Sequence, residues 1–170
     1  MAPSYGNGEA ESVVGAAFEG NLPSGIRVTT KHRLGETDPD KIEQNIRDGL
    51  DESLKRLQLE RVDLFFLHSN IIPHDFDASV FVTRPATRWW VYEEHFVPTC
   101  KKLVAEGKIG AWAITGIGVP ECLLAALDLD DKPAAVQCIS NLLDSPGDLK
   151  YFPGPSRARE IIAKTKSIGA

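Results

Sequence analysis

Residues 62–68 read Val-Asp-Leu-Phe-Phe-Leu-His, a nearly continuous apolar run bounded by charged and polar residues. Such a run is typical of a parallel β-strand covered on both faces, because a half-exposed strand would alternate apolar and polar side chains. The sequence therefore predicts a buried strand at residues 62–68. The patterns on either side of it indicate what kind of sheet this strand joins.

Helical and strand patterns alternate on both sides of that run. The strongest helix begins near Thr37 or Asp38, has Pro39 in its first turn and carries an apolar stripe to Leu59. Residues 69–90 have no clear periodicity and are expected to form a long loop, and Pro98 is expected to kink the helix that follows. In all, the patterns predict helices over 9–19, 38–59, 92–106, 120–127 and 156–167, and strands over 26–31, 62–68, 109–115 and 134–140.

This alternation of helices and strands predicts right-handed βαβ crossovers and hence a parallel sheet of the α/β class. Alternation alone permits both a doubly wound open sheet and a barrel, and periodicity does not distinguish them.

Composition narrows the classes of function. The chain has 170 residues, of which 42% are hydrophobic and 25% charged, and it reads as one globular unit over 1–170. Its formal net charge is -5 with scattered Lys and Arg, which gives no electrostatic footprint for nucleic acid or an anionic membrane. With no apolar run near the roughly 18 residues of a membrane span and no leader pattern, we expect a cytoplasmic protein.

The cysteines carry no metal-binding pattern. Cys100, Cys122 and Cys138 form no C-x-x-C pair and have no His at ligand spacing, so neither a zinc site nor a disulfide framework is indicated. We expect reduced thiols and no metal.

Three short segments carry residues that handle protons: Ala-Pro-Ser-Tyr-Gly at 2–6, Val-Thr-Thr-Lys at 28–31, and the strand that ends at His68. With their flanks they resemble the aldo-keto reductases, a family of (β/α)8-barrel enzymes that use NADPH. The segment Met-Ala-Pro-Ser-Tyr-Gly matches the second half of that family's D-x-A-x-x-Y-G pattern, whose Asp would fall immediately before Met1.

The resemblance runs from the end of the family's second strand to the helix after its sixth. It implies a partial TIM-type (β/α)8 barrel, because a complete barrel typically needs about 250 residues.

The resemblance also implies catalytic roles for Tyr5, Lys31 and His68. When a hydride adds to a carbonyl carbon, the oxygen becomes alkoxide-like and needs a proton and hydrogen-bond donors. Tyr5 would donate the proton, Lys31 would stabilise the tyrosinate that remains, and His68 would orient the carbonyl. The loss of the family's Asp, which pairs with the Lys, is expected to leave Lys31 more mobile.

Cofactor contacts are implied at three further positions. Thr115-Gly116 stands where the family has a Ser-Asn pair, Gln137 matches a Gln that contacts the nicotinamide amide, and Asn141 matches an Asn four positions later. Ser140 replaces the family's stacking aromatic, so the nicotinamide platform is expected to be weakened.

Two functional hypotheses remain open at this point. The first is an NADP-dependent oxidoreductase that interconverts a small aldehyde or ketone and its alcohol, with a substrate that the sequence does not identify. The second is a catalytically inactive truncated remnant or binding module of the same fold. A half-barrel would also expose unpaired strand edges, which makes self-association a further hypothesis.

Overall fold

The computed structural model describes residues 1–35, 37–77, 79, 86–140 and 155–170. Its main sheet has the order β1-β2-β5-β6, and every pair of neighbouring strands is parallel. The strands are β1 (Thr29–His32), β2 (Val62–Leu67), β5 (Ile109–Thr115) and β6 (Val136–Gln137). The predicted parallel sheet is confirmed, and the apolar run at residues 62–67 forms its second strand.

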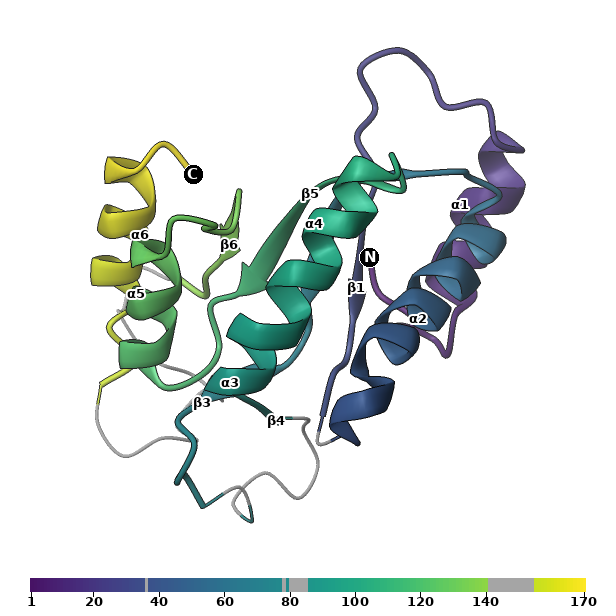
Figure 1. The fold of residues 1–170 in the computed structure, drawn as a ribbon. Coiled ribbons are helices and arrows are strands. Elements are labelled where there is room, and N and C mark those ends of the chain that lie inside the picture. Colours follow the sequence, from purple (N-terminus) through teal and green to yellow (C-terminus); the bar gives the residue numbers. More distant parts are fainter. Residues whose placement is uncertain (36, 78, 80–85, 141–154) are drawn as a thin grey trace.

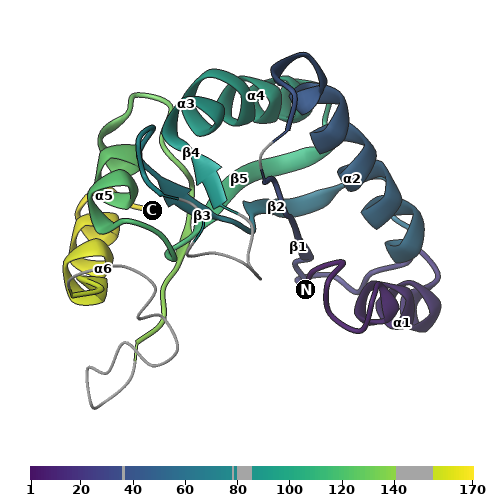
Figure 2. The same ribbon diagram turned by 90° about the horizontal axis from the view of Figure 1, so that it is seen from below.

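The helices lie in an arc along one side of this sheet, as Figure 2 shows. They are α1 (Glu9–Phe18), α2 (Ile42–Leu57) with a preceding 3-10 turn (Pro39–Lys41), α4 (Val97–Ala105), α5 (Pro120–Asp128) and α6 (Ala158–Ser167). A doubly wound sheet would reverse its strand order and carry helices on both faces. Strands that follow one another in chain order with helices outside them are instead a sector of a (β/α)8 barrel.

The core fills the space between the sheet and the helices. The stripe of α2 is buried as predicted, with Ile42, Ile46 and Leu50 inaccessible to solvent. From the strand side Phe65 is equally buried, and its ring stacks on Phe96 with centroids 6.4 Å apart. Alternation along a strand sends Phe65 toward the helices and therefore sends Phe66 to the opposite, inner face.

The expectation of a long loop over 69–90 is corrected by the structure. After β2 the chain forms β3 (Asn70–Ile72), which pairs in parallel with β4 (Ala86–Arg88), and α3 (Trp89–Val91) begins directly after β4. Strands of three residues are too short to show a period, and their pairing joins segments distant in the chain. Figure 1 shows this pair below the main sheet.

The helix that was expected to begin at residue 92 also differs from the prediction. A π-helical turn occupies Tyr92–Phe96, where the amide of Val97 donates to the carbonyl of Tyr92, and Pro98 lies in the first turn of α4. Because Pro98 has no amide hydrogen, it is accommodated best at the start of a helical segment. A widened turn just before the proline therefore takes the place of a simple kink.

Candidate active site

Tyr5 is held by a tight turn between the N-terminus and α1. The amide of Tyr5 donates to the carbonyl of Ala2 at 3.0 Å, and the amide of Ala10 donates back to the carbonyl of Tyr5 at 3.3 Å. Gly6 and Gly8 have φ values of 62° and 93°, a left-handed region that glycine adopts without a steric penalty. This turn places the phenol beside the end of β1, where it is 45% exposed.

The ammonium of Lys31 meets this phenol. Lys31 lies on β1, is only 6% exposed, and its Nζ donates a hydrogen bond to the Tyr5 hydroxyl at 3.0 Å. The same Nζ lies 5.0 Å from the centre of the Tyr5 ring and 6.0 Å from the ring of Phe66. No carboxylate pairs with Lys31 within the described part of the chain, and its ammonium contacts the phenol hydroxyl and the faces of two aromatic rings.

His68 completes the group of three. It follows β2 directly, its amide donates to the carbonyl of His32 at 2.7 Å, and its ring stands edge-on to that of Tyr5 with centroids 5.8 Å apart. Burial, and to a smaller extent the positive charges of Lys31, Arg33 and the N-terminal ammonium, together lower the pKa of His68 to about 4. The imidazole is therefore neutral at pH 7, with one N–H to donate.

One ring nitrogen of His68 is left without a partner. Its Nδ1 is buried and makes no hydrogen bond to any residue that the structure describes. A buried polar atom without a partner costs about 1–3 kcal/mol, so it is a feature that a bound molecule or water would relieve.

The sheet register places the remaining candidates on the same face. Lys31 is opposite Phe66, Phe66 is opposite Ala113, and Thr115, two residues after Ala113, is opposite Gln137. Because side chains two residues apart share a face, Lys31, Thr115 and Gln137 project from one side of the sheet near the carboxyl ends of their strands. In a parallel α/β barrel that is where substrates bind.

The two cofactor candidates differ in exposure. Thr115 is 4% exposed, and its hydroxyl donates to the carbonyl of Leu67 at 3.0 Å, whereas Gln137 is exposed at the end of β6. Asn141, the third predicted contact, lies outside the described residues. The structure thus brings Tyr5, Lys31 and His68 into contact and places Thr115 and Gln137 side by side farther along the same face.

Sequence reasoning missed one residue that holds this site together. Glu11 is fully buried, its carboxylate accepts a bond from the hydroxyl of Thr30, and its other oxygen receives Nε of Arg56 at 2.7 Å. It lies on the face of α1 that also carries Val14 and Phe18, at helical spacing. A carboxylate in an apolar stripe was the signal that could have revealed it.

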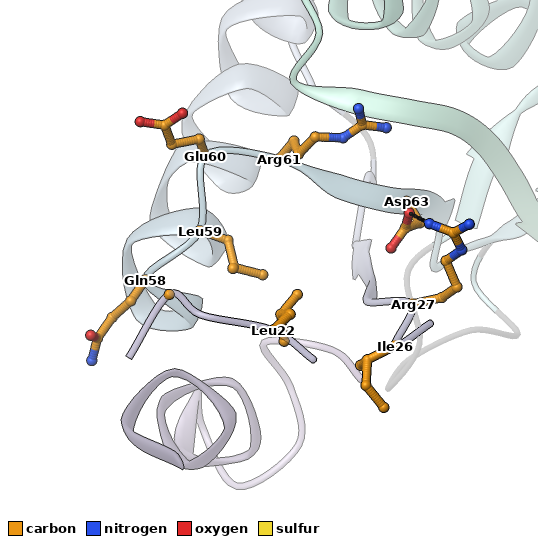
Figure 3. Close-up of a pocket in the computed structure, with 9 residues that line it drawn as sticks. Leu22, Ile26, Arg27, Gln58, Leu59, Glu60, Arg61 and Asp63 are labelled. Carbon is orange, nitrogen blue, oxygen red and sulfur yellow. Dashed lines mark hydrogen bonds and ion pairs between the residues drawn. The ribbon is translucent and has the colours of Figure 1, made fainter. Parts of the chain in front are cut away.

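A hollow lies at the opposite end of the sheet from these side chains. Figure 3 shows it at the start of β2, lined among others by Leu22, Ile26, Leu59 and the ion pair of Arg27 with Asp63 at 3.3 Å. Its volume is about 630 Å³, but it opens at the amino ends of the strands. In a (β/α)8 barrel that end contributes stability rather than catalysis, so size alone does not identify the active site.

The described residues include neither a metal-binding cluster nor a helix that could span a membrane. None of the groups of His, Cys, Asp and Glu found there could hold a metal ion, and all three cysteines are free. Among the helices of those same residues, none has the length and apolar character needed to cross a bilayer.

Comparison with known proteins places the chain in a family. The sequence model described as "Aldo/keto reductase family" matches residues 1–152. A search of curated proteins found no match.

Solved structures with similar folds carry the same description. An aldo/keto reductase from Klebsiella pneumoniae in complex with NADP and acetate is 26% identical, with a TM-score of 0.58 over 86% of this chain and 44% of that one. An aldo-keto reductase from Klebsiella pneumoniae in complex with NADPH is 23% identical, with a TM-score of 0.65 over 99% of this chain and 48% of that one. The chain thus spans less than half the length of each of these relatives.

Proposed function

Because the chain belongs to the aldo/keto reductase family, we propose that it is an NADP-dependent oxidoreductase that reduces an aldehyde or ketone to an alcohol, or catalyses the reverse reaction. The observation that carries the proposal is the hydrogen bond of 3.0 Å from the buried Lys31 ammonium to the Tyr5 hydroxyl, beside the ring of His68. The relatives bound to NADP and NADPH support the choice of cofactor.

The three side chains would share the work of moving one proton. As the carbonyl oxygen gains charge, the Tyr5 hydroxyl gives it a proton, and the adjacent Lys31 ammonium stabilises the tyrosinate that remains. Neutral His68 donates an N–H to the same oxygen and fixes the direction from which the carbonyl is presented. NADPH, when bound, would supply the hydride that adds to the carbonyl carbon.

The inner face of the sheet is compatible with a nicotinamide. The exposed Gln137 side-chain amide makes no hydrogen bond to the residues that the structure describes and could bond to a carboxamide. Thr115 keeps acceptor lone pairs, although its hydroxyl hydrogen is donated to the carbonyl of Leu67. We propose that Thr115, Gln137 and Asn141 contact the cofactor, with Thr115 acting only as an acceptor.

Binding and turnover of the purified chain test the proposal. Titration calorimetry should detect NADPH binding with a micromolar dissociation constant, and NADPH oxidation should accelerate when small aldehydes are added. A folded sample that binds no NADPH and turns over no aldehyde would contradict the oxidoreductase and favour the inactive remnant or binding module.

The main sheet has β1 and β6 as its edge strands, which bears on whether two copies of the chain associate. Pairing of such edges between two copies would cover unpaired backbone groups. We propose self-association through these edges, and light scattering on the same sample tests it, since a monodisperse monomer would exclude it.

A further inference from the structure

Arg33 is a charged residue at this site without an assigned role. It comes one residue after the end of β1 and two residues after Lys31, and its side chain is exposed. It makes no hydrogen bond or ion pair with any other residue that the structure describes. By contrast, Arg47 reaches Glu106 and Arg56 reaches Glu11, each within 2.8 Å. The guanidinium of Arg33 therefore keeps its full capacity to bind an anion.

A small cavity is lined by both Arg33 and His68, the one member of the proposed catalytic group in its described walls. Its volume is about 200 Å³, and its walls include Arg33, His68, and Pro3 and Ser4 from the turn that carries Tyr5. The remaining walls come from His32 and from α2. Sites for drug-sized ligands start at about 300 Å³, so this cavity suits a molecule of a few carbon atoms.

The charges around the cavity favour a negative ligand. Arg56, which also lines it, is neutralised by Glu11 at 2.7 Å and lies 3.7 Å from Glu52, the only acidic residue in the described lining. Arg33 has no carboxylate partner among the described residues, and neither does Lys31, which lies two residues earlier on β1 but is not part of the cavity lining. Two positive charges thus stand uncompensated at the carboxyl end of β1, in a chain whose formal net charge is -5.

We propose that Arg33 selects carbonyl substrates that carry a carboxylate a few bonds from the reacting carbon. The planar guanidinium would pair with the carboxylate through two parallel N–H bonds, while the carbonyl oxygen lies between Tyr5 and His68. The inference rests on the proposed reduction of a carbonyl at this site and adds the chemical class of the substrate.

A matched pair of substrates isolates the charge. Succinic semialdehyde and the methyl ester of the same acid have the same aldehyde and nearly the same length, but only the first is an anion at pH 7. A charged hydrogen bond contributes about 1.5–3 kcal/mol. We therefore expect kcat/KM for NADPH-dependent reduction to favour the anion by roughly ten-fold or more.

Two variants separate local recognition from overall charge. Arg33→Gln should bring the ratio of the two kcat/KM values close to one. Arg61→Gln makes the same change in net charge at an exposed position at the other end of β2, and it should leave the ratio as in the unmodified chain. A ratio that survives Arg33→Gln, or that falls equally in both variants, would overturn the assignment.

A binding measurement keeps the test independent of catalysis. If neither aldehyde is reduced, the proposed function fails, and titration of the apo chain with succinate is followed through the NMR signals of the His68 ring. Signals that shift in the unmodified chain and in Arg61→Gln, but not in Arg33→Gln, would support an anion site at Arg33. Signals that do not move in the unmodified chain would refute it.

Discussion

Arg56 on α2 donates through Nε to the carboxylate of Glu11 on α1 at 2.7 Å, and that carboxylate has no exposed surface. The same group accepts the hydroxyl of Thr30, the residue before Lys31. One buried charge thus ties the helix that follows Tyr5 to the strand that carries Lys31. The two residues of the proposed proton-transfer pair come from separate segments, and Glu11 links those segments.

Removing this link should destabilise the fold. Glu11→Ala leaves Arg56 without its buried partner and Thr30 without an acceptor, so we expect the free energy of unfolding to fall by about 3 kcal/mol. Urea denaturation measures it. The exposed Glu52, which lies 3.7 Å from the same arginine, is the control, and Glu52→Ala should cost less than about 1 kcal/mol. Equal losses would show that burial of Glu11 has no special consequence.

Tyr5→Phe should abolish carbonyl reduction while the chain stays folded. The change removes the proposed proton donor and almost no volume, from a side chain that is 45% exposed. We expect a loss of at least about 100-fold in kcat, the lower end of what general acid catalysis contributes. Steady-state NADPH oxidation and thermal unfolding are the measurements, and turnover retained in a folded variant would exclude Tyr5 as the donor.

Lys31→Met should lower the activity and raise the stability of the chain. Lys31 is 6% exposed, and its ammonium has no carboxylate partner in the described part of the chain, so an apolar side chain of similar length avoids a desolvation cost. We expect the free energy of unfolding to rise by about 1 kcal/mol. We expect kcat to fall by about 100-fold, because the tyrosinate loses its stabilising charge. A variant that loses stability together with activity would indicate that Lys31 is structural.

His68 should make stability depend on pH below neutrality. Its pKa in the folded chain is about 4, lowered mainly by burial, whereas an unfolded His titrates near pH 6.5. Since the unfolded chain binds the proton more tightly, stability is lost as the pH falls from about 6.5 toward 4. Urea midpoints of His68→Gln should decline less over that range than those of the unmodified chain. An equal decline would contradict the role of His68 in this pH dependence. The exposed His74 offers the control variant His74→Gln.

Gly49→Ala should be destabilising although the position is helical. A Cβ at Gly49 would clash with Nδ1 of His32, whose Nε2 is hydrogen-bonded to the side-chain oxygen of Asn45 at 2.9 Å. We expect a loss of about 1–3 kcal/mol from this overpacking, against the gain of up to about 1 kcal/mol that alanine normally brings to a helix. In a His32→Ala background the ring is absent, so the same change should stabilise. A loss of similar size in both backgrounds would show that His32 is not the cause.

The sequence predicted those elements whose pattern is local and long. The stripe from Ile42 to Leu57 repeats over the full length of α2, and Ile109–Thr115 was predicted with the bounds that the structure gives it. By contrast, β6 is confined to Val136–Gln137 within a predicted strand of seven residues. Gln137 pairs with Thr115, where β5 ends, so residues 138–140 have no partner within β5. The β3–β4 pair was missed because three-residue strands carry no period.

What the sequence alone determined is the parallel α/β class and, through a family resemblance, three residue types suited to carbonyl chemistry. Tertiary structure decided which residues meet. Lys31 is 26 positions from Tyr5, and their hydrogen bond exists because a turn with two left-handed glycines brings the phenol to the end of β1. The burial of Glu11 and the open guanidinium of Arg33 are likewise set by neighbours distant in sequence, whose contacts no local pattern encodes.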